Sequence, residues 1–443
     1  MARCVMGDCT DNIMAIVPLT HVCRYWRESV TSTPEIWASI SGQNEDMAVV
    51  SLQRAKAAPL KISFNMRWDT DCPSFPDIIR PYLQNTRTLA VDLIPSIEKF
   101  ASMFPNFPQS MPGLQSLTLS LSAGADWDRS VDLFEPFTPA LKSLSLEFIP
   151  LSPSMLGLRT LTEFSIQDPH FNLHLDAFLD FLEGNHSLES ATIEIEFLES
   201  SIRTSQRRTK MKNKLRDLRL ESWDVEDAQA LISNIPLQRG SHLRIDLLGG
   251  NARLSDTLPE ISTAHLSYPE PPTFFEIEHQ RSFRRILLRG PGGSFSFGRP
   301  SVLEESVEDF SELPLSNVRE VRLVYKKNPP DPPAFSLSSF PLLETLVVER
   351  CINVPRILSI LLSGPSSSPT LKTLAFLNCD IPEEFMEGLT KFASERQPTS
   401  WLYRVLMVRE NGVFPSATSI RELRKYVKVV DVRMGDKLPK DLT

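Results

Sequence analysis

Length, composition and charge already exclude several classes of protein. The chain has 443 residues, 41% of them hydrophobic, and a formal net charge of −8. This hydrophobic share supports a substantial core and argues against a chain that is disordered throughout. An acidic chain is also a poor general binder of nucleic acid or anionic membranes. The 35 prolines against 17 glycines favour many short elements over a few long helices.

The cysteines and the apolar runs indicate a protein of the cytosol or nucleus. No apolar run approaches the ~20 residues needed to span a bilayer, and no basic segment followed by an apolar one marks a secretory signal. Asn185-His186-Ser187 matches the glycosylation sequence but has no meaning without secretion. Six cysteines are too few and too scattered for a disulfide framework, and we expect reduced thiols: Cys4, Cys9, Cys23, Cys72, Cys351 and Cys379.

Residues 13–60 are predicted to form a small helical module. Apolar side chains at Leu19, Val22, Cys23 and Trp26 follow the i, i+3, i+4, i+7 spacing of one helical face. A second short helix is expected to start at Thr33-Pro34-Glu35 and to end between Trp37 and Ile40. A third amphipathic helix is predicted over 46–58, and alternation over 60–64 predicts a strand.

These residues resemble a known adaptor-binding module. The segments Pro18–Glu28 and Thr33–Trp37 resemble the second half of an F-box, and Leu52–Leu60 continues the similarity to the large F-box-like family of fungi. The resemblance implies a three-helix module that docks onto a Skp-type adaptor and so joins a cullin-based ubiquitin ligase. It implies adaptor contacts from Pro18, Leu19, Val22, Pro34 and Ile36, with Trp26 and Trp37 holding the module together.

Residues 1–12 depart from that family. F-boxes begin with a Leu-Pro dipeptide and an amphipathic first helix, and residues 1–12 show neither. Three interpretations follow: a truncated form or gene model, a weakened adaptor surface, or a helical cap for the following array with no adaptor at all.

The remaining chain, 61–443, repeats a short pattern, Leu-x-x-Leu-x-Leu, in which other apolar residues replace some leucines. Strand, turn, helix and turn in units of ~20–29 residues are the signature of leucine-rich repeats. Weaker candidates span 158–166, 243–247, 261–266 and 283–288. Clear copies begin at Leu114, Leu141, Leu188, Leu215, Val318, Leu343, Leu371, Leu402 and Val427.

Between several copies the spacing predicts helices, starting at Leu175, Val354 and Glu383. Asp380 and Glu383 resemble a capping arrangement for the last of these. We therefore expect an α/β chain: the helical module, then an irregular solenoid with parallel strands on its concave face and helices and loops outside. Pro-rich breaks interrupt it near 268–273 and 328–333.

Catalytic and metal-binding patterns are not found, and neither a cofactor nor an enzyme is expected. Gly290–Ser294 is glycine-rich but lacks the Lys-Ser or Lys-Thr of a phosphate loop, which favours a turn. Cys351 and Cys379 lie one repeat apart, where the leucine-rich consensus takes Asn or Cys, so buried thiols are predicted. A basic cluster is interpreted as a solvated loop, an import signal or a contact for an acidic or phosphorylated partner. Its members are Arg203, Arg207, Arg208, Lys210, Lys212 and Lys214, followed by Arg216 and Arg219.

Two functions fit these patterns. The first is an F-box-like substrate receptor of a ubiquitin ligase, whose array binds an unknown protein substrate. The second is a leucine-rich interaction scaffold without a link to ubiquitin. Neither requires a membrane, and nucleic acid is an unlikely ligand for so acidic a chain.

Overall fold

The structure, a computed structural model, is an α/β protein that divides into two compact units. Unit 1 comprises Met1–Gln206 and Lys210–Leu215, and unit 2 comprises Arg207–Thr209 and Arg216–Thr443. The residues described are 17–66, 74–104, 107, 109–122, 141–197, 215–222, 225–235, 240–247, 272–280, 283–290, 293–300, 313, 315–325, 339–351, 354, 370–396, 402–409 and 414–434. Within them, no helix is long and apolar enough to cross a membrane.

Unit 1 contains an all-parallel sheet in which β1 to β7 pair in chain order. The sheet already begins at β1, so it starts before residue 61, where the array was predicted to begin. The elements are α2 (Arg24–Ser32), η1 (Pro34–Trp37), β1 (Ser39–Ser41), α3 (Glu45–Ala55), β2 (Leu60–Asn65), α4 (Phe75–Ile79), η3 (Arg80–Asn85), β3 (Thr86–Ile94), α5 (Ile97–Met103), β4 (Ser116–Leu121), β5 (Ser143–Glu147), η4 (Met155–Gly157), β6 (Glu163–Leu173), α6 (Leu175–Gly184) and β7 (Ser190–Phe197).

Unit 2 contains a mixed sheet with the strand order β8-β9-β12-β11-β10-β13-β14-β15-β16-β17. All neighbours are parallel except β10, β11 and β12, which form an antiparallel meander. The elements are β8 (Asp217–Ser222), α8 (Val225–Asn234), β9 (His242–Leu247), β10 (Phe274–Gln280), β11 (Phe283–Gly290), β12 (Gly293–Pro300), η5 (Leu315–Asn317), β13 (Glu320–Tyr325), β14 (Thr345–Glu349), β15 (Thr373–Leu377), α12 (Glu383–Glu395), β16 (Arg404–Arg409), α13 (Ala417–Leu423) and β17 (Val429–Met434).

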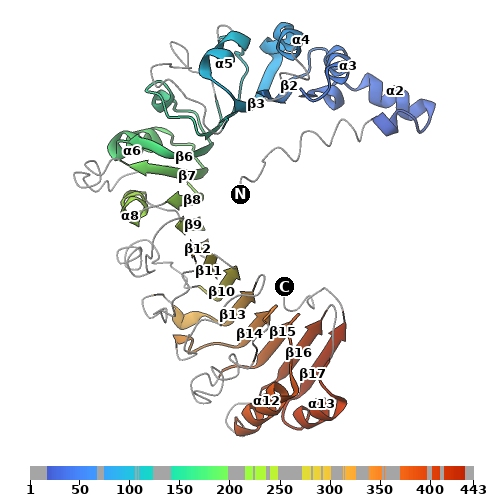
Figure 1. Cartoon of the computed structure of the whole chain (residues 1–443), viewed down its shortest axis with the longest axis vertical. Helices are drawn as coiled ribbons and strands as arrows, with labels where there is room; N and C mark the ends of the chain where they lie inside the picture. Colours follow the sequence, from blue (N-terminus) through green and yellow to red (C-terminus); the bar gives the residue numbers. More distant parts are fainter. Residues whose placement is uncertain are drawn as a thin grey trace. The chain divides into compact units, whose positions relative to one another are not determined.

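The repeated apolar positions place the helices on one face of each sheet (Figure 1). Side chains alternate along a strand, so the leucines of one copy all point to the same face. There they meet the helices: the Phe164 ring of β6 lies 5.0 Å from Phe181 of α6, and Phe376 of β15 lies 5.1 Å from Phe385 of α12. We call the opposite face the strand face.

A left-handed turn residue recurs where several strands end, and it marks the repeat as strongly as the leucines do. Phe148, Arg350 and Asn378 have φ between 54° and 59° and directly follow β5, β14 and β15. Each donates its backbone N–H to the next strand along, as Asn378 does to the carbonyl of Val408 at 2.7 Å. The residue after the turn is buried, and after two of these turns it is a cysteine, Cys351 or Cys379.

The sequence patterns predicted most strands correctly but missed four. The predicted copies coincide with β4, β5, β7, β8 and β13 to β17, and weaker candidates coincide with β6, β9 and β11. β2 coincides with the alternating segment 60–64, whereas β3, β10 and β12 were not predicted, and β1 lies where the second short helix was expected to end. The prediction of parallel strands is wrong for β10, β11 and β12, which pair antiparallel, whereas a mostly parallel α/β fold is confirmed. Gly290 pairs with Gly293 at the β11–β12 connection, as expected of a turn.

Several local predictions need correction or lie beyond the described residues. The helix predicted through Leu19 and Trp26 is interrupted at Cys23, whose extended backbone precedes α2. Pro382, not Asp380, is the N-cap of α12, and no side chain caps that helix. Residues 1–12, the candidate strand 261–266, most of both Pro-rich breaks and nearly all of the helix predicted from Val354 lie outside the described residues.

Candidate protein-binding surfaces

Four large apolar side chains are exposed near the start of the described chain. Leu19, Val22, Tyr25 and Trp26 are between 37% and 74% exposed, and they lie on α2 and on the turn before it. We call these four residues the N-terminal apolar patch. Neighbouring exposed apolar side chains indicate a protein-binding surface.

Trp37 attaches this patch to the first strands of unit 1. Its side chain is 1% exposed, and its indole Nε1 donates to the backbone carbonyl of Val30 at 2.8 Å. The Arg54 guanidinium of α3 lies 4.2 Å from the centre of the Trp37 ring. The end of α2 is therefore fixed to η1 and α3. At the other end, Arg27 Nε donates to the carbonyl of Thr20 at 2.8 Å and orders the preceding turn.

The predicted site residues of the module fall into different environments. Pro18, Leu19 and Val22 are exposed, whereas Pro34 and Ile36 are half-buried on η1. Trp26, expected to hold the module together with Trp37, is exposed and belongs to the patch. Tyr25 was missed, although its position next to Trp26 on a helix was a signal that could have found it.

The strand face of unit 1 consists largely of small hydroxyl side chains. Neighbouring strands place one row of such residues side by side across the sheet: Ser41, Ser63, Thr118, Ser145, Ser165 and Thr192, with Ala90 between the second and third. In a parallel row nearer the strand ends, Ser120 Oγ donates to Glu147 Oε2 at 2.9 Å. Burial and the nearby Glu147 raise the pKa of the Asp92 carboxyl.

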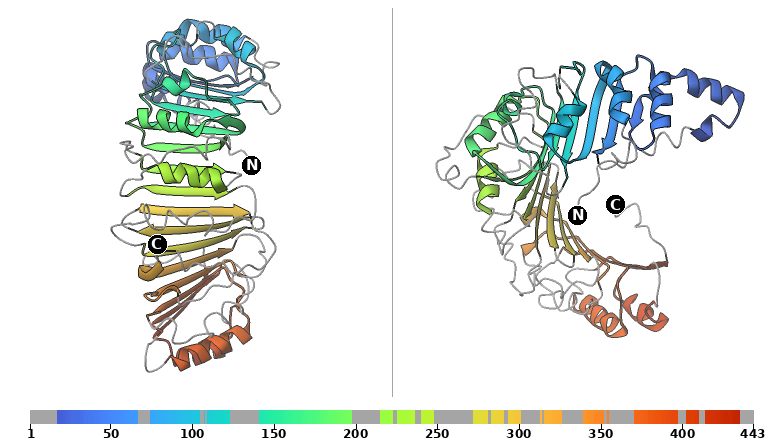
Figure 2. Two further views of the ribbon diagram at one scale, coloured as in Figure 1. Left: turned by 90° about the vertical axis from the view of Figure 1, so that its left-hand side faces the viewer. Right: turned by 45° about the horizontal axis from the view of Figure 1, so that its top comes forward.

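The strand face of unit 2 is charged instead and contains two networks of arginines and carboxylates. In one, Arg322 of β13 lies 2.6 Å from Glu349 of β14 and 3.8 Å from Glu276 of β10. The pKa of the Glu276 carboxyl is raised, because desolvation by burial outweighs the opposing effect of the nearby Arg322. Figure 2 shows the strands of this unit side by side.

The other network centres on Asp246 of β9, a buried carboxylate. Arg244 Nε lies 2.6 Å from Asp246 Oδ2, and Arg285 of β11 approaches Oδ1 at 3.4 Å. Arg219 of β8 reaches Oδ2 at 3.9 Å and also pairs with Glu221. Arginines from three strands therefore meet at one carboxylate.

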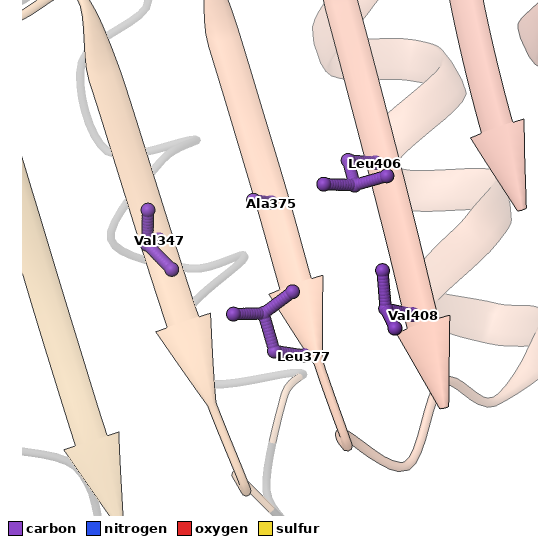
Figure 3. Packing of buried hydrophobic residues seen from close by; sticks show 5 residues of the cluster. All are labelled: Val347, Ala375, Leu377, Leu406 and Val408. Carbon is purple, nitrogen blue, oxygen red and sulfur yellow. The ribbon is translucent and has the colours of Figure 1, made fainter. Parts of the chain in front are cut away.

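Further along the same face, the charges give way to apolar residues. Val347, Ala375, Leu377, Leu406 and Val408 form one buried cluster on β14, β15 and β16 (Figure 3). Val347 pairs in register with Ala375, which pairs with Leu406. The strand face of unit 2 thus has a charged part and an apolar part.

In the part of the chain that the structure describes, no three His, Cys, Asp or Glu side chains lie together in a way that could hold a metal ion. Cys351 and Cys379 are buried free thiols, as predicted. Burial raises the pKa of Cys379 to about 12, and its Sγ lies 3.3 Å from the carbonyl of Val348. A thiol with such a pKa is a poor nucleophile at neutral pH. Of the predicted basic cluster, Arg203 to Lys214 lie outside the described residues, whereas Arg216 and Arg219 are described and Arg219 lies on β8.

Comparisons with known proteins give no relative. No protein-family model matches the sequence. No curated protein is significantly similar to it.

Proposed function

We propose that the chain is an F-box-like substrate receptor of a cullin-type ubiquitin ligase. The N-terminal apolar patch binds a Skp-type adaptor, and the repeated strands present a surface to a protein substrate. The chain itself performs no bond chemistry; it raises the local concentration of substrate lysines near a charged ubiquitin carrier. The protein acts in the cytosol or the nucleus, where its partners are found.

The exposed N-terminal apolar patch is the observation that supports this proposal most. Leu19 and Val22 belong both to the patch and to the segment that resembles an F-box. Trp37 joins the patch to the first strands of a repeated sheet, so a docking element and a recognition array are attached to each other. That combination is what a substrate receptor requires.

A pull-down with a purified Skp-type adaptor tests the proposal. We expect the full chain to be retained, and Leu19→Asp or Val22→Glu to reduce retention at least tenfold, because a buried apolar contact contributes about 1.5–3 kcal/mol. Leu342→Asp is the matched control, since Leu342 of unit 2 is 39% exposed against 37% for Leu19. No retention of the wild-type chain under conditions that retain an intact F-box protein rejects the ligase role.

The second candidate is an interaction scaffold with a leucine-rich array and no link to ubiquitin. It is favoured by the charged and apolar parts of the strand face of unit 2, which lie in a different unit from the segment that resembles an F-box. A chain that binds other proteins through its strand faces but never the adaptor matches this function.

A further inference from the structure

The arginines around Asp246 have hydrogen-bonding capacity that their carboxylate neighbours do not use. A guanidinium offers five N–H donors in a fixed plane and is suited to bidentate binding of carboxylates. The side chains of Arg219, Arg244 and Arg285 remain between 24% and 40% exposed, whereas the Asp246 side chain is 4% exposed. The carboxylate lies beneath the arginines and orients them, and the guanidinium groups still reach solvent.

Two donors in the same place lack an acceptor. Within the described residues, Ser296 Oγ and Arg219 Nε are buried and have no hydrogen-bond partner. The buried Glu221 Oε1 also lacks a hydrogen bond, but it forms an ion pair with Arg219. Ser296 of β12 is 7% exposed and pairs in register with Arg244 of β9, which pairs with Arg219 of β8. Its neighbours Phe295 and Phe297 are buried, as expected for side chains on the helix-covered face. Arg219, Arg244 and Ser296 therefore form a row of donors on the strand face.

Buried donors without acceptors are costly, and an oxygen-rich ligand would remove that cost. The carboxylates already present are Glu221 beside Arg219, Asp246 at the centre, and Glu278, whose Oε2 lies 3.6 Å from Arg285. They roughly balance the three arginines, so net charge does not identify the ligand. The unused N–H of Arg219 does, because it can only donate, and the Ser296 hydroxyl can donate to the same acceptor.

We propose that the strand face at β8, β9, β11 and β12 binds an acidic segment of a partner protein, whose carboxylate oxygens accept hydrogen bonds from Arg219, Arg244 and Ser296. We call this row the donor row. All three residues belong to unit 2. The inference goes beyond the proposed function, since the donor row would act equally in a ligase receptor and in a scaffold.

Fluorescence anisotropy with the full chain and labelled 15-residue peptides tests the donor row. One peptide carries alternating Glu residues in a Gly-Ser background, and its matched partner carries Gln at the same positions. We expect only the Glu peptide to bind. Arg219→Gln and Arg244→Gln should each weaken binding about tenfold or more, the loss expected for one charge-assisted hydrogen bond. Ser296→Ala should weaken it by a smaller factor.

Two further variants separate recognition from folding. Glu221→Gln removes a carboxylate that competes for Arg219, so it should tighten binding of the Glu peptide, which a purely structural role does not predict. Arg319→Gln is the control, because Arg319 is an exposed arginine of unit 2 that pairs with Glu344 at 3.1 Å, outside the donor row. It should leave the affinity unchanged.

Three outcomes would overturn the proposal. The first is equal binding of the Glu and Gln peptides. The second is a pair of results: Arg244→Gln leaves the affinity unchanged, and replacing Lys210, Lys212 and Lys214 together by Gln abolishes binding. That pair would show that the acidic peptide binds the basic cluster instead. The third is binding of a phosphoserine version of the peptide without binding of the Glu version, which would exclude carboxylate as the recognised group.

Discussion

Asn185 shows how one side chain can join two neighbouring repeats. Its Nδ2 donates to the carbonyls of Leu158 at 3.0 Å and Phe181 at 2.9 Å, while its Oδ1 accepts from the N–H of Leu161 at 3.1 Å. The side chain is fully buried. It therefore closes the end of α6 onto the loop before β6. The sequence showed only a glycosylation pattern at this residue, because hydrogen bonds to distant backbone groups leave no mark in residue spacing.

Asn185→Ala should destabilise unit 1 by about 3 kcal/mol, because it removes three buried hydrogen bonds, to the Leu161 N–H and to the carbonyls of Leu158 and Phe181. Chemical denaturation of the full chain, followed by hydrogen exchange in peptides from β6 and α6, would measure the loss. His186→Ala is the matched control, since the His186 side chain next to it is exposed. Equal destabilisation by both variants would contradict the bridging role of Asn185.

At the scale of elements, Glu383 links two helices rather than capping its own. The N–H of Ser416, the N-cap of α13, donates to Glu383 Oε1 at 2.7 Å, and the Ser419 hydroxyl donates to Oε2. These hydrogen bonds lower the pKa of the Glu383 carboxyl, and the bond from Ser419 has the largest effect. The carboxylate of α12 thus supplies acceptors to the first turn of α13.

The link should weaken in acid. A carboxyl whose pKa is lower in the folded state stabilises the fold above its unfolded pKa of about 4.3 and loses this contribution as pH falls through the folded value. Protection factors of α13 amides should therefore fall with Glu383 protonation below about pH 4. Glu383→Gln should lower them at pH 7 and remove this pH dependence, and Glu384→Gln should do neither. Identical profiles in both variants would exclude the link.

Apart from β11, whose candidate began at Phe283, the leucine pattern predicted strands whose leading apolar position is a leucine or valine. β3 has the same buried pattern, but Thr86 occupies its first position, and in β10 that position belongs to Pro272. A search for strands that begin with a buried leucine therefore finds neither β3 nor β10. The turn between β11 and β12 was recognised from its glycines, whereas the reversal of strand direction was not, because leucine spacing is the same in parallel and antiparallel strands.

The candidate surfaces were predictable only where they lie within one segment. Leu19 and Val22 stand in one short stretch of sequence, so a resemblance could indicate them. The donor row combines Arg219, Arg244 and Ser296 from three strands, and β12 becomes the neighbour of β9 only through the antiparallel meander. Sequence reasoning placed Arg219 at the end of a basic cluster but could not align it with residues 25 and 77 positions further on.

At the scale of the whole molecule, a repeated sheet implies that stability is transmitted mainly between neighbouring strands. Within unit 2, Leu374 of β15 is fully buried, and its strand pairs with β14 and β16. Leu374→Ala should cost about 2–5 kcal/mol. The lost hydrogen-exchange protection should be concentrated in β14, β15 and β16 and be small in β8 and β9.

Leu218→Ala on β8 provides the reciprocal test, since Leu218 is also buried and pairs in register with Leu243 of β9. Its effect should be concentrated in β8 and β9 and be small in β15. A compact domain with a single cooperative core would instead lose protection uniformly after either substitution. If the two variants lose hydrogen-exchange protection in different strands, each strand of unit 2 depends mainly on its neighbours. A uniform loss of protection after both substitutions would reject the repeat interpretation of unit 2.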